Sequence, residues 1–130
     1  MELTSKQTLE LAKSFSNMAA LVLDYSLDTW ERTTEDQQVQ LAKLFQQLID
    51  YSNLYINLSG TLLFKDAQSD LQSLDEIVNE MNDTLKKLED VQLVIHIIGT
   101  VLDLGAAIAS KDPALIVSKI QSVFLELKRE

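Results

Sequence analysis

Apolar residues recur along the chain at alternating steps of three and four, the spacing of one face of an α-helix. The first stripe predicts a helix over residues 4–31. Thr4 precedes Gln7 by three residues, the spacing of a capping box that satisfies free amides at a helix start. The buried side of this helix is predicted to consist of Leu11, Phe15, Met18, Val22 and Tyr25, widened by Ala12, Ala19 and Leu23.

A second helix is predicted over residues 35–63. Thr34 and Gln37 repeat the capping-box spacing, and the acidic residues that follow Thr34 suit the positive end of a helix dipole. The predicted buried stripe of this helix comprises Leu41, Leu44, Leu48, Tyr51, Tyr55, Leu58 and Leu62.

The third stripe is the most regular in the sequence, with strict four-three alternation through Leu71, Leu74, Val78, Met81, Leu85 and Leu88. Spacing near 3.5 residues is typical of bundle or coiled-coil packing. Because no Gly or Pro separates this stripe from the apolar stretch that follows, we predict one helix over residues 66–109. A bend near Glu89–Gln92 or at Gly99 is the alternative.

A final helix is predicted over residues 113–128. Asp112 is well suited to cap it, and Pro113 is favourable at a first helical position, where its missing amide proton is not needed. The turn before it is predicted at Ser110–Asp112. The sequence therefore predicts a single all-α domain over residues 1–130, a four-helix bundle with three long helices and a short C-terminal one. The last two helices form an apolar hairpin.

The length of the third helix raises the question of what covers this hairpin. At 1.5 Å per residue, an unbroken helix 66–109 spans about 66 Å, whereas the first two span about 42–44 Å. The overhanging hairpin would expose an apolar patch, and a homodimer would bury it. The candidate partner-binding residues on this patch are Ile95, Ile98, Leu102, Ile116 and Ile120. A bent helix would instead return the hairpin to its own bundle.

Composition narrows the classes of function. With 130 residues the chain fits one domain, and its 3 Gly and 1 Pro leave little turn chemistry for a sheet. The formal net charge of −9 disfavours binding to nucleic acid. Acidic residues lie between the apolar residues of the third stripe. They are candidates for binding a basic protein partner, or they form a solvated face: Asp75, Glu76, Glu80 and Asp83.

A membrane is the alternative partner for the apolar hairpin, residues 93–127. Leu93–Ala109 has only seventeen residues and contains His96 and Asp103, whereas a spanning helix needs about twenty residues. A central Asp costs about 2.5–3.5 kcal/mol on insertion. Conditional insertion, as in pore-forming helical proteins, stays open as the second hypothesis.

Candidate chemistry is sparse. His96 is the single histidine, and its aliphatic neighbours favour a residue at the edge of the core over a general base. We expect no catalytic residues, no metal site and no cofactor. The absence of cysteine and of an N-terminal signal pattern predicts a cytoplasmic protein, with signal-independent secretion left open. The leading hypothesis is a non-enzymatic interaction protein (a regulator, adaptor, immunity-type or assembly subunit); an uncharacterised enzyme is the third.

Overall fold

A computed structural model describes residues 4–57 and 67–128, and these residues form helices joined by short connections. The prediction of an all-α fold is confirmed. The elements in chain order are α1 (Ser5–Asp28), the 3₁₀-helix η1 (Trp30–Arg32), α2 (Glu35–Tyr55), α3 (Ala67–Lys87), α4 (Val91–Ser110) and α5 (Pro113–Lys128).

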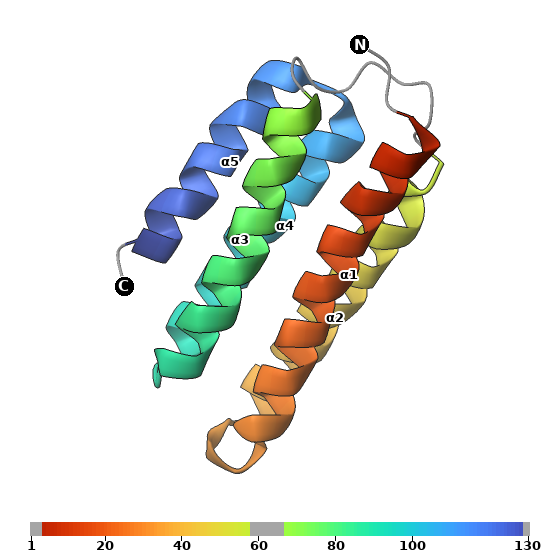
Figure 1. Cartoon of the computed structure of the whole chain (residues 1–130). Coiled ribbons are helices and arrows are strands. Elements are labelled where there is room, and N and C mark those ends of the chain that lie inside the picture. Colours follow the sequence, from red (N-terminus) through yellow and green to blue (C-terminus); the bar gives the residue numbers. More distant parts are fainter. Residues whose placement is uncertain (1–3, 58–66, 129–130) are drawn as a thin grey trace.

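The five α-helices run alternately down and up the long axis of the molecule (Figure 1). α1 packs against α2 and α3, α2 also packs against α4, and α5 packs against both α3 and α4. These contacts form a ring in the order α1, α2, α4, α5, α3. The apolar sides of the helices meet inside this ring and form one core.

The prediction of a single helix over residues 66–109 is wrong, because the chain breaks at residues 88–90 between α3 and α4. Asp90 caps the new helix: its carboxylate accepts hydrogen bonds from the amides of Gln92 and Leu93, at 3.0 and 3.3 Å. The bend near Glu89–Gln92, which the sequence left open, is the arrangement adopted. The predicted helix is therefore interrupted without Gly or Pro, at the point where Asp90 caps the start of α4.

A side-chain hydrogen bond from η1, the segment that follows α1, supports this break. Nη1 of Arg32, in η1, donates a 2.6 Å hydrogen bond to the carbonyl oxygen of Glu89. The carbonyls at a helix end lack intrahelical partners, so the guanidinium satisfies a group that the break leaves free. α4 then runs back along the bundle, and the predicted overhang of the hairpin does not form.

The predicted N-terminal caps of α1, α2 and α5 are confirmed. Thr4 and Thr34 both form complete capping boxes, and Asp112 accepts hydrogen bonds from the amides at the start of α5. The turn between α4 and α5 lies where Pro113 requires it. The first helix ends three residues early, at Asp28, and η1 follows. α2 ends at Tyr55, and the remainder of the predicted helix 35–63 beyond residue 57 lies outside the described residues.

The predicted stripes account for most of the core, with one informative exception on α3. All five stripe residues of α1 are buried. On α3, however, Ile77 is fully buried and Val78 only partly so. The buried positions on α3 are spaced by three, three, four and four residues, so they do not keep the strict four-three alternation: Leu71, Leu74, Ile77, Met81 and Leu85. α3 faces two neighbours, α1 and α5, so its buried side is wider than a single coiled-coil seam.

α4 is the most deeply buried element. Half of its twenty residues are buried, and its exposed positions include Gln92, His96 and Asp103. These three share one side of the helix, at spacings of four and seven. The polar residues that interrupt the apolar stretch therefore form its solvent-facing stripe, while the remaining sides contact the core.

Aromatic rings fix how closely α1, α2 and α4 approach one another. Phe15 of α1 packs edge-on against Tyr55 of α2, with ring centroids 4.9 Å apart, and Tyr51 stacks beside Tyr55. The Tyr55 hydroxyl donates a 2.7 Å hydrogen bond to the carbonyl oxygen of Gly105 on α4. A Cβ added to Gly105 would lie 2.8 Å from Tyr51 Cδ2 and 3.2 Å from Phe15 Cε2. The absence of a side chain at residue 105 therefore allows these rings to reach α4.

Replacing Gly105 by Ala should destabilise the fold. The added methyl group meets rings that are held on several sides, so either the rings or α4 must shift, at a cost of about 1–3 kcal/mol. Gly99 provides the control, because nothing lies within 4 Å of a Cβ built there. Gly99→Ala should stabilise α4 by about 0.5–1 kcal/mol through helix propensity alone. Urea unfolding of both variants measures the difference, and equal stabilities would contradict the packing described here.

Stability should fall at alkaline pH because of Tyr55. Burial is the main reason that the pKa of its hydroxyl lies well above the ordinary 10.0, and the nearby Tyr51 adds to the effect. Above about pH 10 the unfolded chain releases this proton while the folded chain keeps it, so unfolding is increasingly favoured. Tyr55→Phe should lose about 1 kcal/mol at neutral pH, where a buried hydrogen bond is removed.

The same variant should show a shallower loss of stability between pH 10 and 11.5 than the wild-type protein. Thermal melts by circular dichroism across that interval measure both slopes. Parallel pH profiles would show that Tyr55 does not carry the alkaline transition.

Candidate functional site

The residues of the apolar hairpin that we predict to bind a partner do not form an open surface. Ile98 and Ile116 are fully buried, Ile95 and Ile120 nearly so, and Leu102 is partly buried. In this fold these side chains belong to the protein's own core and are not accessible to a partner. The argument for a homodimer rested on an overhanging hairpin, which the break at residues 88–90 removes. The oligomeric state itself stays a prediction.

The acidic residues between the apolar positions of the third stripe lie on the outer side of α3. Asp75, Glu76 and Asp83 are exposed and Glu80 is partly exposed. Asp75 also accepts a 3.3 Å hydrogen bond from the hydroxyl of Ser14, so it helps to join α3 to α1. Within residues 4–57 and 67–128, His, Asp and Glu side chains do not gather in threes as a metal site requires. Whether this face binds a basic partner stays a prediction.

His96 lies on the surface and not at the edge of the core. Its Nε2 is 3.4 Å from a carboxylate oxygen of Glu126, which links α4 to α5. The imidazole is 61% exposed and the Glu126 side chain 20%, so solvent reaches the pair from the histidine side and its contribution to stability is small. The sequence-based placement at the core edge was therefore wrong, because the polar stripe of α4 faces solvent.

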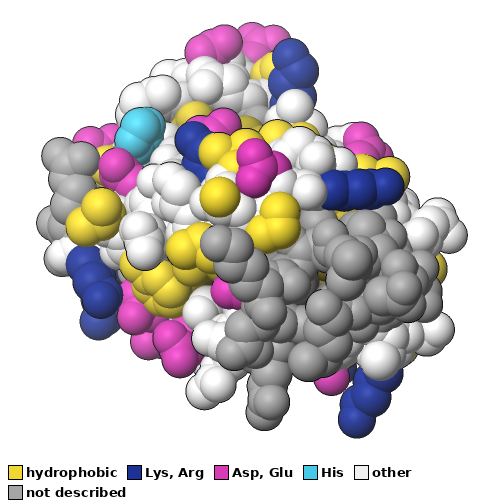
Figure 2. Space-filling model, turned by 90° about the horizontal axis from the view of Figure 1, so that it is seen from above, with side chains coloured by type: hydrophobic (Ala, Val, Ile, Leu, Met, Phe, Trp, Pro, Cys, Tyr) yellow, Lys and Arg dark blue, Asp and Glu magenta, His cyan; other side chains and the backbone are white. Residues whose placement is uncertain are grey.

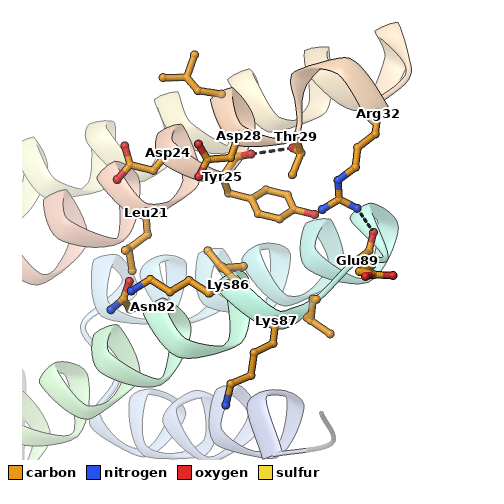
Figure 3. Close-up of a pocket in the computed structure, with 13 residues that line it drawn as sticks. Leu21, Asp24, Tyr25, Asp28, Thr29, Arg32, Asn82, Lys86, Lys87 and Glu89 are labelled. Carbon is orange, nitrogen blue, oxygen red and sulfur yellow. Dashed lines mark hydrogen bonds between the residues drawn. The ribbon is translucent and has the colours of Figure 1, made fainter.

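A polar hollow of about 500 Å³ lies where the ends of α1 and α3 meet (Figure 3). Both charge signs line it: Asp24, Asp28, Arg32, Lys86, Lys87 and Glu89. Tyr25 reaches under this rim, and its hydroxyl points toward the Arg32 guanidinium (Figure 3). That hydroxyl is buried, and no described residue meets hydrogen-bond geometry with it.

Burial raises the pKa of Tyr25, and the Arg32 charge partly opposes this effect. Because the Tyr25 hydroxyl is covered, it is not presented to a molecule entering the hollow. Arg32 is also committed to the Glu89 carbonyl across the same junction. The lining of the hollow therefore includes the contact that joins the end of α1 to the break between α3 and α4.

A second hollow, with mainly apolar lining, lies on the outer side of the α1–α2 hairpin. A groove of about 380 Å³ there is lined mainly by apolar side chains, which define the α1–α2 groove: Leu23, Leu27, Trp30, Val39, Ala42 and Phe45. Leu27 is 64% exposed, Val39 62%, Trp30 53% and Leu23 42%. Single exposed apolar residues are common on proteins, but several that converge on one hollow mark an interaction site.

The sequence contained a signal for this groove. Leu23, Leu27 and Trp30 recur at steps of four and three, beside the buried stripe of the same helix. Leu23 was instead assigned to the core, and Val39 was assigned no role. A second apolar stripe on one helix indicates either a second buried contact or an open one, and the arrangement of neighbouring helices determines which. Here neither α3, α4 nor α5 covers this side of the hairpin.

The other end of the bundle has a different surface. There, where α1, α3 and α5 begin, Lys and Arg side chains are interspersed with Asp and Glu around scattered apolar groups (Figure 2).

Within the described residues, α4 (Val91–Ser110) is the helix long and apolar enough to cross a membrane, and half of its most apolar window is buried inside the bundle.

Comparisons of the chain with protein families, with curated proteins and with solved structures found no match.

Proposed function

We propose that this protein is a non-enzymatic interaction protein that binds a protein partner through the α1–α2 groove. The observation that carries the proposal is the convergence of Leu23, Leu27, Trp30 and Val39 on one open hollow. Exposed apolar area is unfavourable by about 25 cal/mol per Å², so covering these side chains would supply binding free energy. Tryptophan is also among the residues that most often dominate binding energy at interfaces.

The helices that form the groove are packed against the core. Leu41, which also lines the groove, is fully buried, and α2 contacts both α1 and α4. A surface held by a packed core changes little on binding, which limits the entropy lost when a partner docks. This rigidity supports recognition of a partner more than a catalytic cycle.

Membrane insertion of the α4–α5 hairpin is the second candidate, and the apolar length of α4 supports it. The packing opposes it. Insertion would have to draw fully buried side chains such as Ile98, Val101 and Leu104 out of the core. The bundle would therefore have to open before α4 could meet lipid.

Photocrosslinking tests the proposed function. Leu27 should be replaced by p-benzoylphenylalanine in the native host, and ultraviolet light should then join the protein to whatever covers the groove. We expect one discrete adduct, identified by mass spectrometry. A second change, Val39→Ser, should reduce its yield, because it removes part of the same apolar surface.

Leu125 on α5 is the matched control, since it is the same residue type, is 66% exposed and lies away from the groove. The photoreactive residue at 125 should give no adduct of the same mass. Equal adducts from positions 27 and 125, or none from 27, would show that the groove is not the partner-binding surface.

Flotation with liposomes distinguishes the second candidate. We expect the folded protein to stay at the bottom of the gradient with neutral phosphatidylcholine vesicles at physiological salt, because the apolar side chains of α4 are in the core. Acidified samples at about pH 5 serve as a parallel measurement, since helical proteins that insert conditionally often open when their carboxylates are protonated. Stable flotation at neutral pH would contradict the interaction proposal and favour insertion.

A further inference from the structure

Resting on the proposed function, we infer that the occupant of the α1–α2 groove is an amphipathic α-helix of a partner protein, with Lys or Arg residues along its flank. Two observations lead to this partner: the shape of the groove between two helices, and the charges of the segment that forms it.

The groove runs between two antiparallel helices, with Leu23, Leu27 and Trp30 along one wall and Val39, Ala42 and Phe45 along the other. From residue 23 to residue 30 the wall extends about 10 Å, roughly two helical turns. A third helix fits such a furrow by inserting its side chains between the ridges of α1 and α2. Binding of this kind uses apolar anchors spaced three or four residues apart.

An extended peptide fits the groove less well. The backbone groups of α1 and α2 are already bonded within their helices, so the apolar walls cannot satisfy the amides and carbonyls of a strand. A helix satisfies its own backbone and offers only side chains to the groove. The groove chemistry therefore favours a helical occupant.

The charges of the same segment are predominantly negative. Residues 23–45 contain five acidic residues, Asp24, Asp28, Glu31, Glu35 and Asp36, and two basic ones, Arg32 and Lys43. Glu35 lines the groove itself, and Glu31 and Asp36 are exposed beside it in the chain, whereas Asp24 and Asp28 line the polar hollow near α3. Arg32 is bound to the Glu89 carbonyl at that hollow. An apolar groove that carries Glu35, in a segment of net negative charge, is complementary to a helix with an apolar face and basic flanks.

The same charges disfavour two other occupants. In a two-fold dimer each groove would meet its own copy, which would place Glu35 and the acidic residues next to it in the chain near their own copies. The chain's net charge of −9 adds to that repulsion. An anionic lipid surface would be repelled for the same reason. A basic helix is attracted where these two are not.

The single tryptophan of the chain makes the test direct. Trp30 is 53% exposed in the groove, so its fluorescence should shift to shorter wavelength when a peptide covers it. The probe is a helical peptide of about 18 residues made of Leu and Lys, with Leu at helical three-four spacing. The comparison peptide carries Glu at every Lys position. We expect a saturable shift with the basic peptide, weakened by added salt, and little or none with the acidic one.

Matched variants locate the binding. Leu27→Ser should weaken the basic peptide about tenfold, whereas Leu125→Ser, at an equally exposed leucine, should leave it unchanged. Neutralising Glu31, Glu35 and Asp36 as Gln, Gln and Asn should weaken it severalfold and flatten its salt dependence. The control removes the same number of charges from the acidic face of α3, at Glu76, Glu80 and Asp83, and should have a smaller effect. Circular dichroism checks that each variant is folded.

Several outcomes overturn the inference. Equal binding of the acidic peptide, or equal loss from both charge variants, would mean that the charges of this segment do not select a basic helix. A fluorescence shift on concentrating the protein alone, with a dimer in sedimentation, would assign the groove to a second copy. A shift with neutral vesicles alone would assign it to lipid. If the crosslink at position 27 still identifies a protein partner, the proposed function stands and only the partner's chemistry is wrong.

Discussion

The fold depends on burying α4. This helix carries apolar side chains on most of its circumference, and only a narrow stripe through His96 and Asp103 faces solvent. A helix of that kind is stable in a small bundle only where its neighbours cover its apolar sides. α2 covers one side, α5 covers another, and Phe15 of α1 reaches in to Gly105. The order of the ring follows from this requirement.

Burial of α4 in turn depends on the break at residues 88–90. A continuous helix would carry α4 beyond the ends of α1 and α2, where no core exists to cover it. Asp90 provides the new helix start, and Arg32 provides a donor for the carbonyl of Glu89. The short corner therefore couples the end of α1 to the reversal of the chain. Tyr25, buried beneath the same corner, completes the junction.

The arrangement that buries α4 also leaves one side of the α1–α2 hairpin open. α3 and α4 cover its inner side, and the outer side keeps a second apolar stripe without a neighbour. The bundle thus has two apolar surfaces, the inner one of the core and the outer one of the α1–α2 groove. The larger one forms the core, and the smaller one, which Glu35 lines together with apolar side chains, is the surface for which we propose a partner.

The sequence by itself determined where α1, α2 and α5 begin and most of the core. Local signals suffice for both: the capping boxes at Thr4 and Thr34, the Asp112–Pro113 start, and the buried stripes of α1 and α2 all depend on residues a few positions apart. Local signals also identified the acidic face of α3, because helical spacing places its carboxylates on one side. What they could not determine was which of two apolar stripes on one helix would find a neighbour.

Only the tertiary structure decided that choice, and with it the candidate site. Ile98 and Leu27 are both apolar residues on amphipathic helices, yet one is fully buried and the other 64% exposed. The difference arises from where α4 and α5 lie, which depends on the break at residues 88–90. Asp90 alone is a weak local signal, and the Arg32–Glu89 contact that supports it joins residues 57 positions apart. A contact between such distant residues has no trace in local spacing, so the sequence left the course of α4 undecided and the folded chain settled it.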